Sequence, residues 1–399
     1  MFSVTRLTMS SLIMAAVLLA VPGRAAAEPY HPHRDDVVLE QLPFRPNTAT
    51  TQVLRNLRVQ SARDPVNLAA ATTLARAYMK QARLSADPRL LGYAQAALAP
   101  WWDQTRPPVD ALVTRAMLRS SLHDFSAAQQ DLDQALQRRP DHAQARLARA
   151  MLLQVRGDYP AARRDCLALL GLGAQLAGHA CLSSVAALNG QARASYALLQ
   201  RTLDNNRDVG PDDSQWLHGL LAEMAARLGD AANAERHYRL ALQSAEPDVF
   251  LLTSYADFLL AQNRAREAVT LLAPHTRADG LLLRLALAEQ RLRAPALREH
   301  IAALEARFAA ARLRGESRHP REEALFLLRL RNKPAEALIL AQQNWLQQRE
   351  PIDASLVLEA AQAAGAPPAA QDVVDWLAET GLEDTHMAKL VTQLGKTPI

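Results

Sequence analysis

The chain has 399 residues, of which 49% are hydrophobic and only 5% aromatic. It contains 77 alanines and 66 leucines, both good helix formers, against 15 glycines, which argues against a β-sandwich, a β-barrel or a disordered polymer and predicts an all-α protein. The 45 basic residues nearly balance the 41 acidic ones, for a formal net charge of +4. A nearly neutral chain is not built to bind phosphate backbones, so we expect no nucleic-acid partner.

Residues 1–27 have the pattern of a secretory signal peptide. Arg6 supplies a positive charge, Leu12–Val21 is an apolar run of ten residues, and three alanines precede Glu28, so cleavage is expected after Ala27. A ten-residue helix is about 15 Å long, too short for a hydrocarbon core of about 30 Å, which argues against the alternative of an uncleaved anchor. Since no later stretch is apolar enough to span a bilayer, we expect the mature chain to lack a transmembrane segment and to be periplasmic or secreted.

Residues 28–46 contain four prolines and are predicted to form an extended N-terminal arm. His31 and His33 lie in this arm, close to Asp35 and Asp36, and imidazole with carboxylate could bind a transition metal weakly. Two histidines in a flexible arm are not a preformed site, so a solvated arm is the simpler interpretation. We therefore predict neither a metal site nor a cofactor.

Alanines recur along the chain with a period of 34 residues. Ala116 and Ala150 are 34 residues apart, and so are Ala222 and Ala256. Another alanine follows each of them after twelve residues, namely Ala128, Ala162, Ala234 and Ala268. Glycines 157, 190 and 229 stand where short turns would end one helix and allow the next to begin. These spacings resemble the tetratricopeptide repeat, in which two antiparallel helices cross closely at small residues.

The resemblance is clearest over residues 109–174 and 215–275 and continues as degenerate repeats over 280–394. It implies a single solenoid over residues 47–399, in which antiparallel helix pairs stack into a right-handed superhelix with a concave inner wall. The alternative is an alanine-rich and leucine-rich helical bundle that matches the period by chance. After Pro46 we expect no sheet and no second globular domain.

In this family, side chains from the first helix of each pair line the inner groove and hold a peptide or a helix. Carried over by repeat position, the resemblance implies a partner-binding groove formed by Val113, Met117, Leu147, Met151, Trp216, Glu223, Phe250 and Asp257. The methionine and aromatic side chains would anchor an apolar ligand, and the two carboxylates would select basic ligand residues. For Trp216 and Phe250, the alternative is a structural role in sealing contacts between repeats.

The sequence lacks the short motifs of nucleophilic, zinc-dependent and nucleotide-binding enzymes. Asp131-Leu132-Asp133 has the form of a metal–nucleotide motif, but residues two apart on a helix face different directions. We therefore predict a non-enzymatic scaffold for a protein or peptide partner in the cell envelope. The alternative is a binding protein for a small molecule, a metal or an anionic ligand, using the histidines of the arm or the stretch 291–331, which has ten arginines against five glutamates. The oligomeric state is left open.

Cys166 and Cys181 are the two cysteines of the chain and lie 15 residues apart. In an oxidising compartment they could form a disulfide between the second helix of one pair and the first helix of the next. The alternative is a pair of small buried thiols that fill space in the core. The sequence alone leaves both possibilities open.

Overall fold

The computed structural model describes residues 34, 36–37, 49–206, 208–313 and 320–395. The chain divides into two units, residues 1–48 and 49–399, and all the helices belong to the second unit. The predicted signal peptide lies outside the described residues, as do His31, His33 and most of the predicted arm. Export and weak metal binding by the arm therefore stay predictions.

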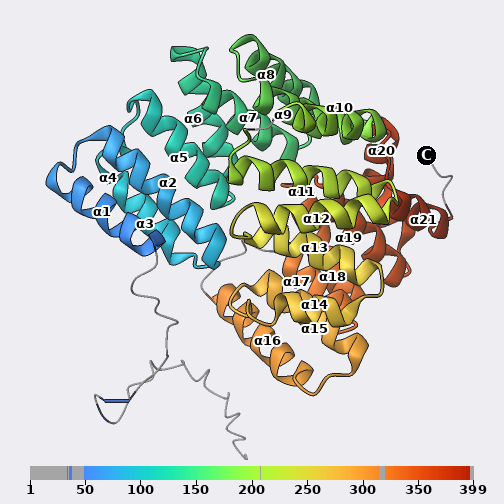
Figure 1. The fold of residues 1–399 in the computed structure, drawn as a ribbon. Coiled ribbons are helices and arrows are strands. Elements are labelled where there is room, and N and C mark those ends of the chain that lie inside the picture. Colours follow the sequence, from blue (N-terminus) through green and yellow to red (C-terminus); the bar gives the residue numbers. More distant parts are fainter. Residues whose placement is uncertain (1–33, 35, 38–48, 207, 314–319, 396–399) are drawn as a thin grey trace, which may run out of the picture. The chain divides into compact units, whose positions relative to one another are not determined.

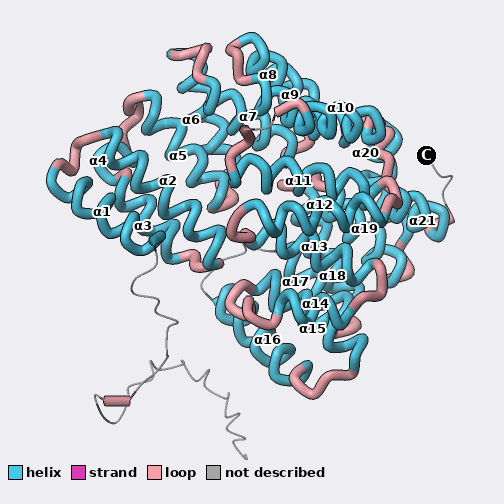
Figure 2. Tube along the Cα trace, in the orientation of Figure 1, coloured by secondary structure: helices cyan, strands magenta, loops and turns pink. Residues whose placement is uncertain are grey.

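The described part of the second unit consists of helices and turns, without a strand (Figure 2). Its first twelve helices are α1 (Ala49–Arg63), α2 (Leu68–Ser85), α3 (Arg89–Ala97), α4 (Ala99–Trp102), α5 (Val109–Ser121), α6 (Phe125–Arg138), α7 (Ala143–Val155), α8 (Tyr159–Gly171), α9 (Gln175–Ala187), α10 (Ala192–Asp204), α11 (Pro211–Arg227) and α12 (Ala231–Ser244). The others are α13 (Val249–Ala261), α14 (Ala265–Leu272), α15 (Asp279–Leu292), α16 (Leu297–Leu313), α17 (Pro320–Arg329), α18 (Pro334–Trp345), α19 (Pro351–Ala363), the short 3-10 helix η1 (Pro367–Ala370), α20 (Gln371–Thr380) and α21 (Thr385–Gln393). The predicted all-α architecture is confirmed. Within the described residues, no helix combines the length and the apolar character that crossing a membrane requires.

Successive helices pack as antiparallel pairs, the arrangement that the 34-residue period predicts (Figure 1). The first helices of the pairs are α2, α5, α7, α9, α11, α13, α15, α17 and α19, and in each case the next long helix in the chain is the second member. From α5 to α19, each first helix also contacts the first helix of the following pair. The first helices therefore form one continuous wall, as in a helical solenoid.

The alanines of the 34-residue pattern lie at the places where helices cross. Each of them has 0% exposure: Ala116, Ala128, Ala150, Ala162, Ala222, Ala234, Ala256 and Ala268. A side chain of one methyl group lets two helix backbones approach closely, whereas a larger one would hold them apart. The spacing of small residues in the sequence is thus the direct cause of the helix pairing.

Each pair turns through a residue in the left-handed backbone conformation. These residues have positive φ and recur every 30 to 39 positions, at Ala86, His123, Gly157, Gly190, Gly229, Asn263, Arg293, Asn332 and Gly365. A left-handed residue ends the first helix and reverses the chain direction. An aspartate follows three of these turns and caps the second helix, by accepting a hydrogen bond from the backbone N–H three residues further on. The turn geometry therefore continues where the repeat sequence becomes degenerate.

The array of helix pairs folds back on itself. The backbone N–H of Arg349, between α18 and α19, donates to the carbonyl of Val155 at the end of α7 (2.7 Å). The hydroxyl of Tyr159 donates to the carbonyl of Arg349 (3.2 Å). Near the C-terminal end, the Glu383 carboxylate accepts a hydrogen bond from the N–H of Ala192 at the start of α10. Repeats almost 200 residues apart in the sequence thus contact one another through their turns.

The first helices of the C-terminal repeats pack on several sides, which corrects the expectation of an open inner groove along the whole array. Nine consecutive residues of α15, Leu281–Glu289, are all buried, although such a run points in every direction around a helix. A helix that is buried on all sides belongs to a core and offers no open face. At α15, therefore, the wall of first helices is part of the core.

Candidate partner-binding surfaces

Four of the eight predicted groove residues lie on α5 and α7. Met151 is 47% exposed, whereas Met117 and Leu147 are half-buried. Val113 is 0% exposed and belongs to a core cluster of α5, α6 and α7, together with Leu132 of α6. The expectation that Val113 contacts a ligand is corrected, because its side chain already fills the space between neighbouring helices.

The other four predicted residues lie on α11 and α13. Phe250 is 71% exposed, whereas Trp216 is half-buried against a core cluster of α9, α10 and α11, which agrees with the alternative structural role. Glu223 is exposed on α11, although protein atoms crowd the surroundings of its carboxyl. This crowding raises the pKa of the Glu223 carboxyl, Arg227 opposes the change, and Glu350 adds to it. Glu223 is thus a less reliable anion than an ordinary surface glutamate.

Asp257 is already paired within the chain. Its carboxylate accepts hydrogen bonds from Nε and Nη2 of Arg284 at 3.0 Å each. Arg284 is only 1% exposed and Asp257 is 33% exposed, so the carboxylate neutralises a buried guanidinium from the next first helix. Asp257 is therefore occupied and does not serve as a free acceptor for basic ligand residues. The eight residues lie on first helices, but they do not form one open surface.

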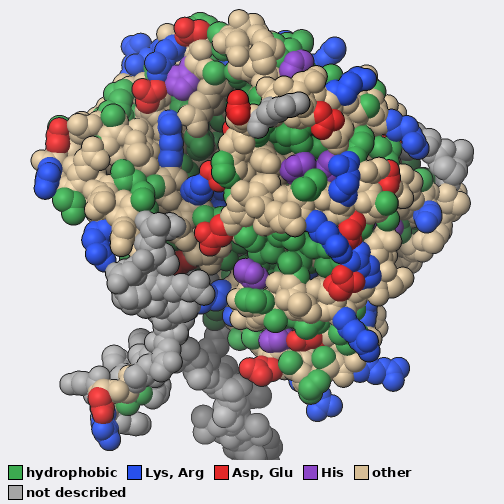
Figure 3. All heavy atoms as spheres, viewed as in Figure 1, with side chains coloured by type: hydrophobic (Ala, Val, Ile, Leu, Met, Phe, Trp, Pro, Cys, Tyr) green, Lys and Arg blue, Asp and Glu red, His purple; other side chains and the backbone are tan. Residues whose placement is uncertain are grey.

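Among the described residues of the stretch 291–331, five arginines are paired with carboxylates of the same unit. Arg321 binds Asp353, and Arg329 binds Glu359 at 2.8 Å, so acids of α19 compensate the arginines of α17. Three further ion pairs join Arg307 to Asp279, Arg312 to Glu323 and Arg331 to Glu305. Basic and acidic side chains are also interspersed over the face seen in Figure 3. These five arginines are therefore weak candidates for an anion-binding surface.

A cleft of about 650 Å³ lies between α16, α17 and α18. Its lining includes two buried aromatic rings, Phe308 of α16 and Phe326 of α17, whose centroids are 5.4 Å apart. Ile339 of α18 also lines the cleft and is 57% exposed. Two of its helices, α16 and α17, fall in the interval from Arg293 to Asn332, which at 39 residues is five longer than the 34-residue period.

The charged residues that line this cleft are paired with one another. Glu305 binds Arg331 at 2.9 Å, Lys333 binds Glu336 at 2.9 Å, and Arg312 binds Glu323. Each positive charge has a carboxylate partner, so the charges sum to zero. No charge of one sign therefore dominates the lining of the cleft, and its aromatic rings make apolar contact the main interaction that it offers.

Asp131 and Asp165 hold a pattern of buried ion pairs that sequence reasoning missed. Asp131 of α6 accepts hydrogen bonds from Arg115 of α5 at 2.7 and 2.9 Å, and from Arg119 at 2.7 Å. One repeat later, Asp165 of α8 binds Arg149 of α7 at 2.7 and 2.8 Å. Both the arginines and the aspartates are 34 residues apart, which was a signal available in the sequence. Asp131 of the apparent metal motif, and Asp165 one repeat later, thus each tie the two helices of a pair together.

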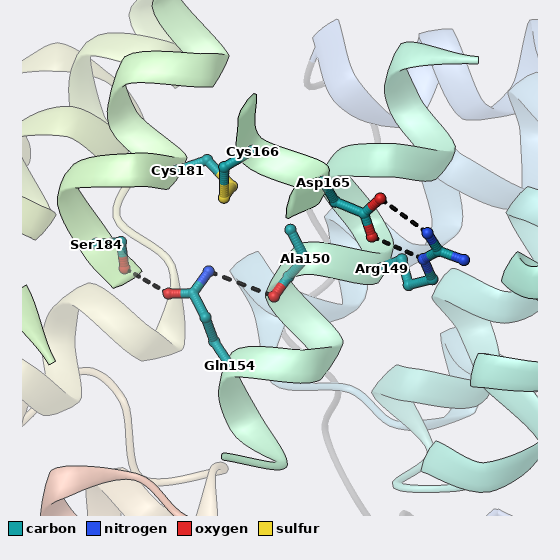
Figure 4. The surroundings of a disulfide bond; sticks show 7 residues. All are labelled: Arg149, Ala150, Gln154, Asp165, Cys166, Cys181 and Ser184. Carbon is teal, nitrogen blue, oxygen red and sulfur yellow. Dashed lines mark hydrogen bonds and ion pairs between the residues drawn. A yellow bond between two sulfur atoms is a disulfide. The ribbon is translucent and has the colours of Figure 1, made fainter. Parts of the chain in front are cut away.

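Cys166 of α8 and Cys181 of α9 are joined by a disulfide, with their Cα atoms 5.4 Å apart (Figure 4). Both residues are buried. On either side of the disulfide in Figure 4, Arg149 pairs with Asp165, and Gln154 of α7 accepts a hydrogen bond from Ser184 of α9 (2.8 Å). A covalent bond and polar contacts therefore fix the junction between these two helix pairs.

The described residues contain no group of three or more histidine, cysteine, aspartate and glutamate side chains that could hold a metal ion. Their one histidine pair is His218 with His237, which sequence reasoning missed because the two residues lie 19 positions apart on neighbouring helices.

No protein-family model matches the chain, and no curated protein matches it at a significant level. Similar solved structures include a tetratricopeptide repeat protein from Parabacteroides merdae, at 21% identity over 56% of this chain and 85% of that chain, with a TM-score of 0.39. The human IFIT1 dimer with m7Gppp-AAAA has 12% identity over 83% of this chain and 77% of its own, with a TM-score of 0.43. Yeast Tom70 has 10% identity over 82% of this chain and 88% of its own, with a TM-score of 0.24. At these identities the likeness concerns the helical fold alone. With its stacked helix pairs, buried alanines and left-handed turns, the chain has a tetratricopeptide-like fold.

Proposed function

We propose that this chain is an exported, non-enzymatic scaffold that holds an apolar peptide or helix of another protein in the cell envelope. Export is supported by the signal-peptide pattern of residues 1–27 and by the disulfide between Cys166 and Cys181, a bond typical of oxidising compartments. A protein-binding role is supported by the architecture, since stacked helix pairs present extended surfaces to a partner.

The cleft between α16, α17 and α18 is the observation that carries this proposal. Its volume of about 650 Å³ can take several apolar side chains of one turn of a partner helix. Each such side chain leaves water on entering, which contributes about 25 cal/mol for every Å² of apolar surface that is buried. The paired charges around the cleft remain at its edge. They keep the complex soluble and favour neither a basic nor an acidic ligand.

A second candidate surface for the same function is what remains open of the predicted inner wall. Met151 and Phe250 keep large exposed fractions of 47% and 71% on first helices. Methionine and phenylalanine give much contact area for each ordered rotamer, which suits an adaptable interface. These two residues therefore belong in the same experiment as the cleft.

A photo-crosslinking amino acid placed at position 339 is expected to capture one envelope protein in intact cells, because Ile339 lines the cleft and is exposed. Mass spectrometry of the adduct identifies the partner. With the purified partner, Ile339→Ala should then weaken binding about tenfold, the usual scale for a central apolar anchor. Leu198 of α10, which is 37% exposed and lies outside both surfaces, is the matched control for crosslinking and for substitution by alanine.

The same experiment distinguishes the two surfaces and tests export. A specific adduct at position 151 or 250, with none at 339, would show that the partner binds the inner wall and not the cleft. No specific adduct at any of the three positions would refute the scaffold. Sequencing of the chain from the periplasmic fraction should give Glu28 as its N-terminus, whereas an uncleaved chain confined to the cytoplasm would refute export.

A further inference from the structure

His218 of α11 and His237 of α12 face each other directly. Their Nδ1 atoms are 3.0 Å apart and their ring centroids 5.2 Å apart, so each imidazole points its Nδ1 edge at the other. His237 is 0% exposed. On its far side, Nε2 of His237 lies 3.0 Å from the hydroxyl of Tyr196 on α10 and 3.0 Å from Nη2 of Arg236. Three consecutive helices, α10, α11 and α12, thus meet at this ring.

The neighbours of His237 determine where its proton lies. A guanidinium can only donate, so Nε2 of His237 must be the unprotonated acceptor, and the ring carries its proton on Nδ1. This Nδ1–H then donates to Nδ1 of His218, which must be unprotonated as well. The cluster is satisfied when both imidazoles are neutral, with a single proton between the two Nδ1 atoms.

We propose that His218, His237, Tyr196 and Arg236 form a proton-operated latch between the α9–α10 pair and the α11–α12 pair, which is closed at neutral pH and opens when the imidazoles take up an additional proton. That proton would go either between the two Nδ1 atoms, where two N–H groups would face each other, or onto Nε2 of His237, against the Arg236 guanidinium. Each position replaces a hydrogen bond by repulsion between donors.

The charges around the cluster act in the same direction. Burial, with smaller contributions from Arg236 and His218, lowers the pKa of His237 to about 3, and Asp230 opposes the change. Burial and Arg236 lower the pKa of His218 as well, with Asp204 of α10 opposing. The remaining neighbour on α10, Gln200, is neutral. An opened latch would return His237 to the ordinary pKa of about 6.5. The closed state is therefore fully stable above about pH 6.5 and loses stability as the pH falls towards 3.

Hydrogen bonds between groups that do not titrate determine which helices separate when the latch opens. Ser214 and Ser244 form a hydrogen bond of 2.9 Å, and Gln215 donates to the carbonyl of Ala245 at 3.1 Å, so α11 and α12 stay joined where α11 begins and α12 ends. Between α10 and α12, the hydrogen bond from Tyr196 reaches the titrating ring itself. Protonation should therefore loosen α10 against α12, within an α11–α12 pair that stays folded.

Hydrogen exchange of the full mature chain tests the latch. After correction for intrinsic exchange rates, the opening constant of residues 192–204 should rise about 30-fold between pH 7.5 and pH 5, since each pH unit below 6.5 contributes a factor of ten. In His237→Gln, which keeps an acceptor for Tyr196 and Arg236 but does not titrate, the rise should be less than about threefold. The control His179→Gln, on α9 outside the cluster, should keep the full response.

A wild-type response below threefold, or an equal response in His237→Gln, would overturn the latch. If the His237→Gln chain fails to fold, nitrogen-15 spectra of the histidine side chains in the wild-type chain decide the question. They should show His237 neutral and protonated on Nδ1 at pH 5. An ordinary titration of His237 near pH 6.5 would overturn the proposal without any variant.

Discussion

Replacing Asp131 by alanine is expected to lower the free energy of unfolding by about 3–5 kcal/mol, because it leaves a buried guanidinium without its counter-charge. The side chains of Arg115 and Asp131 are only 7% and 6% exposed. Arg115 also donates to the carbonyl of Trp101 (3.1 Å), so the same group holds the end of α4 against α5. Urea unfolding at pH 7, followed by circular dichroism, gives the change.

Asp133, two residues further along α6, is the matched control for this prediction. It is 43% exposed, and its ion pair with Arg149 is at the surface, so Asp133→Ala should cost less than about 1 kcal/mol. A double variant, Arg115→Met with Asp131→Leu, removes the buried charge together with its partner and should recover at least half of the loss. Equal losses in Asp131→Ala and Asp133→Ala would contradict the structural role of the buried pair.

Loss of the disulfide is the second large effect that we expect. Cys166→Ala with Cys181→Ala should lower the free energy of unfolding by about 3 kcal/mol, since the bond closes a loop of 15 residues and restricts the unfolded chain. Both residues are buried, so part of any additional loss would come from packing. Denaturant unfolding of the double variant and of the wild type, with and without a thiol reductant, measures the change.

The reductant provides the control for this second prediction. Neither cysteine is free, so a reductant should destabilise the wild type by a similar amount and leave the double variant unchanged. Stability of the wild type that is insensitive to full reduction would show that the bond does not stabilise the fold.

The local part of the fold could be predicted from the sequence, because its causes are local. Alanines at positions such as 116 and 128 had to be small for two helices to cross, and both are fully buried. Gly157 and Gly229 stand at turns that need a positive φ, which glycine adopts without strain. The helix pairs therefore followed directly from the spacing of small residues and of turn residues.

The candidate surfaces were harder to predict, because contacts between distant repeats decide which side chains stay open. Val113 occupies a family groove position but is buried in the core, and Asp257 is paired with Arg284 of the following repeat. No sequence period links Arg349 to Val155, since this contact arises only after the array has folded. A repeat register predicts which helix a residue occupies, but not what will lie against it.

The closure of the array on itself has a consequence for its modularity. Along the early repeats, three successive turns meet the C-terminal region in order: Gly157 lies against Arg349, Gly190 against Gly381, and Gly229 against Thr385. A methyl group added at Gly190 would lie 3.0 Å from the carbonyl oxygen of Gly381, so the match is close. An open solenoid can lose or duplicate a unit, because each unit touches only its neighbours. Here, one unit more or fewer would displace every one of these meeting points, so the number of repeats is itself part of the fold. The repeats from α7 to α12 are expected to unfold together with the C-terminal region.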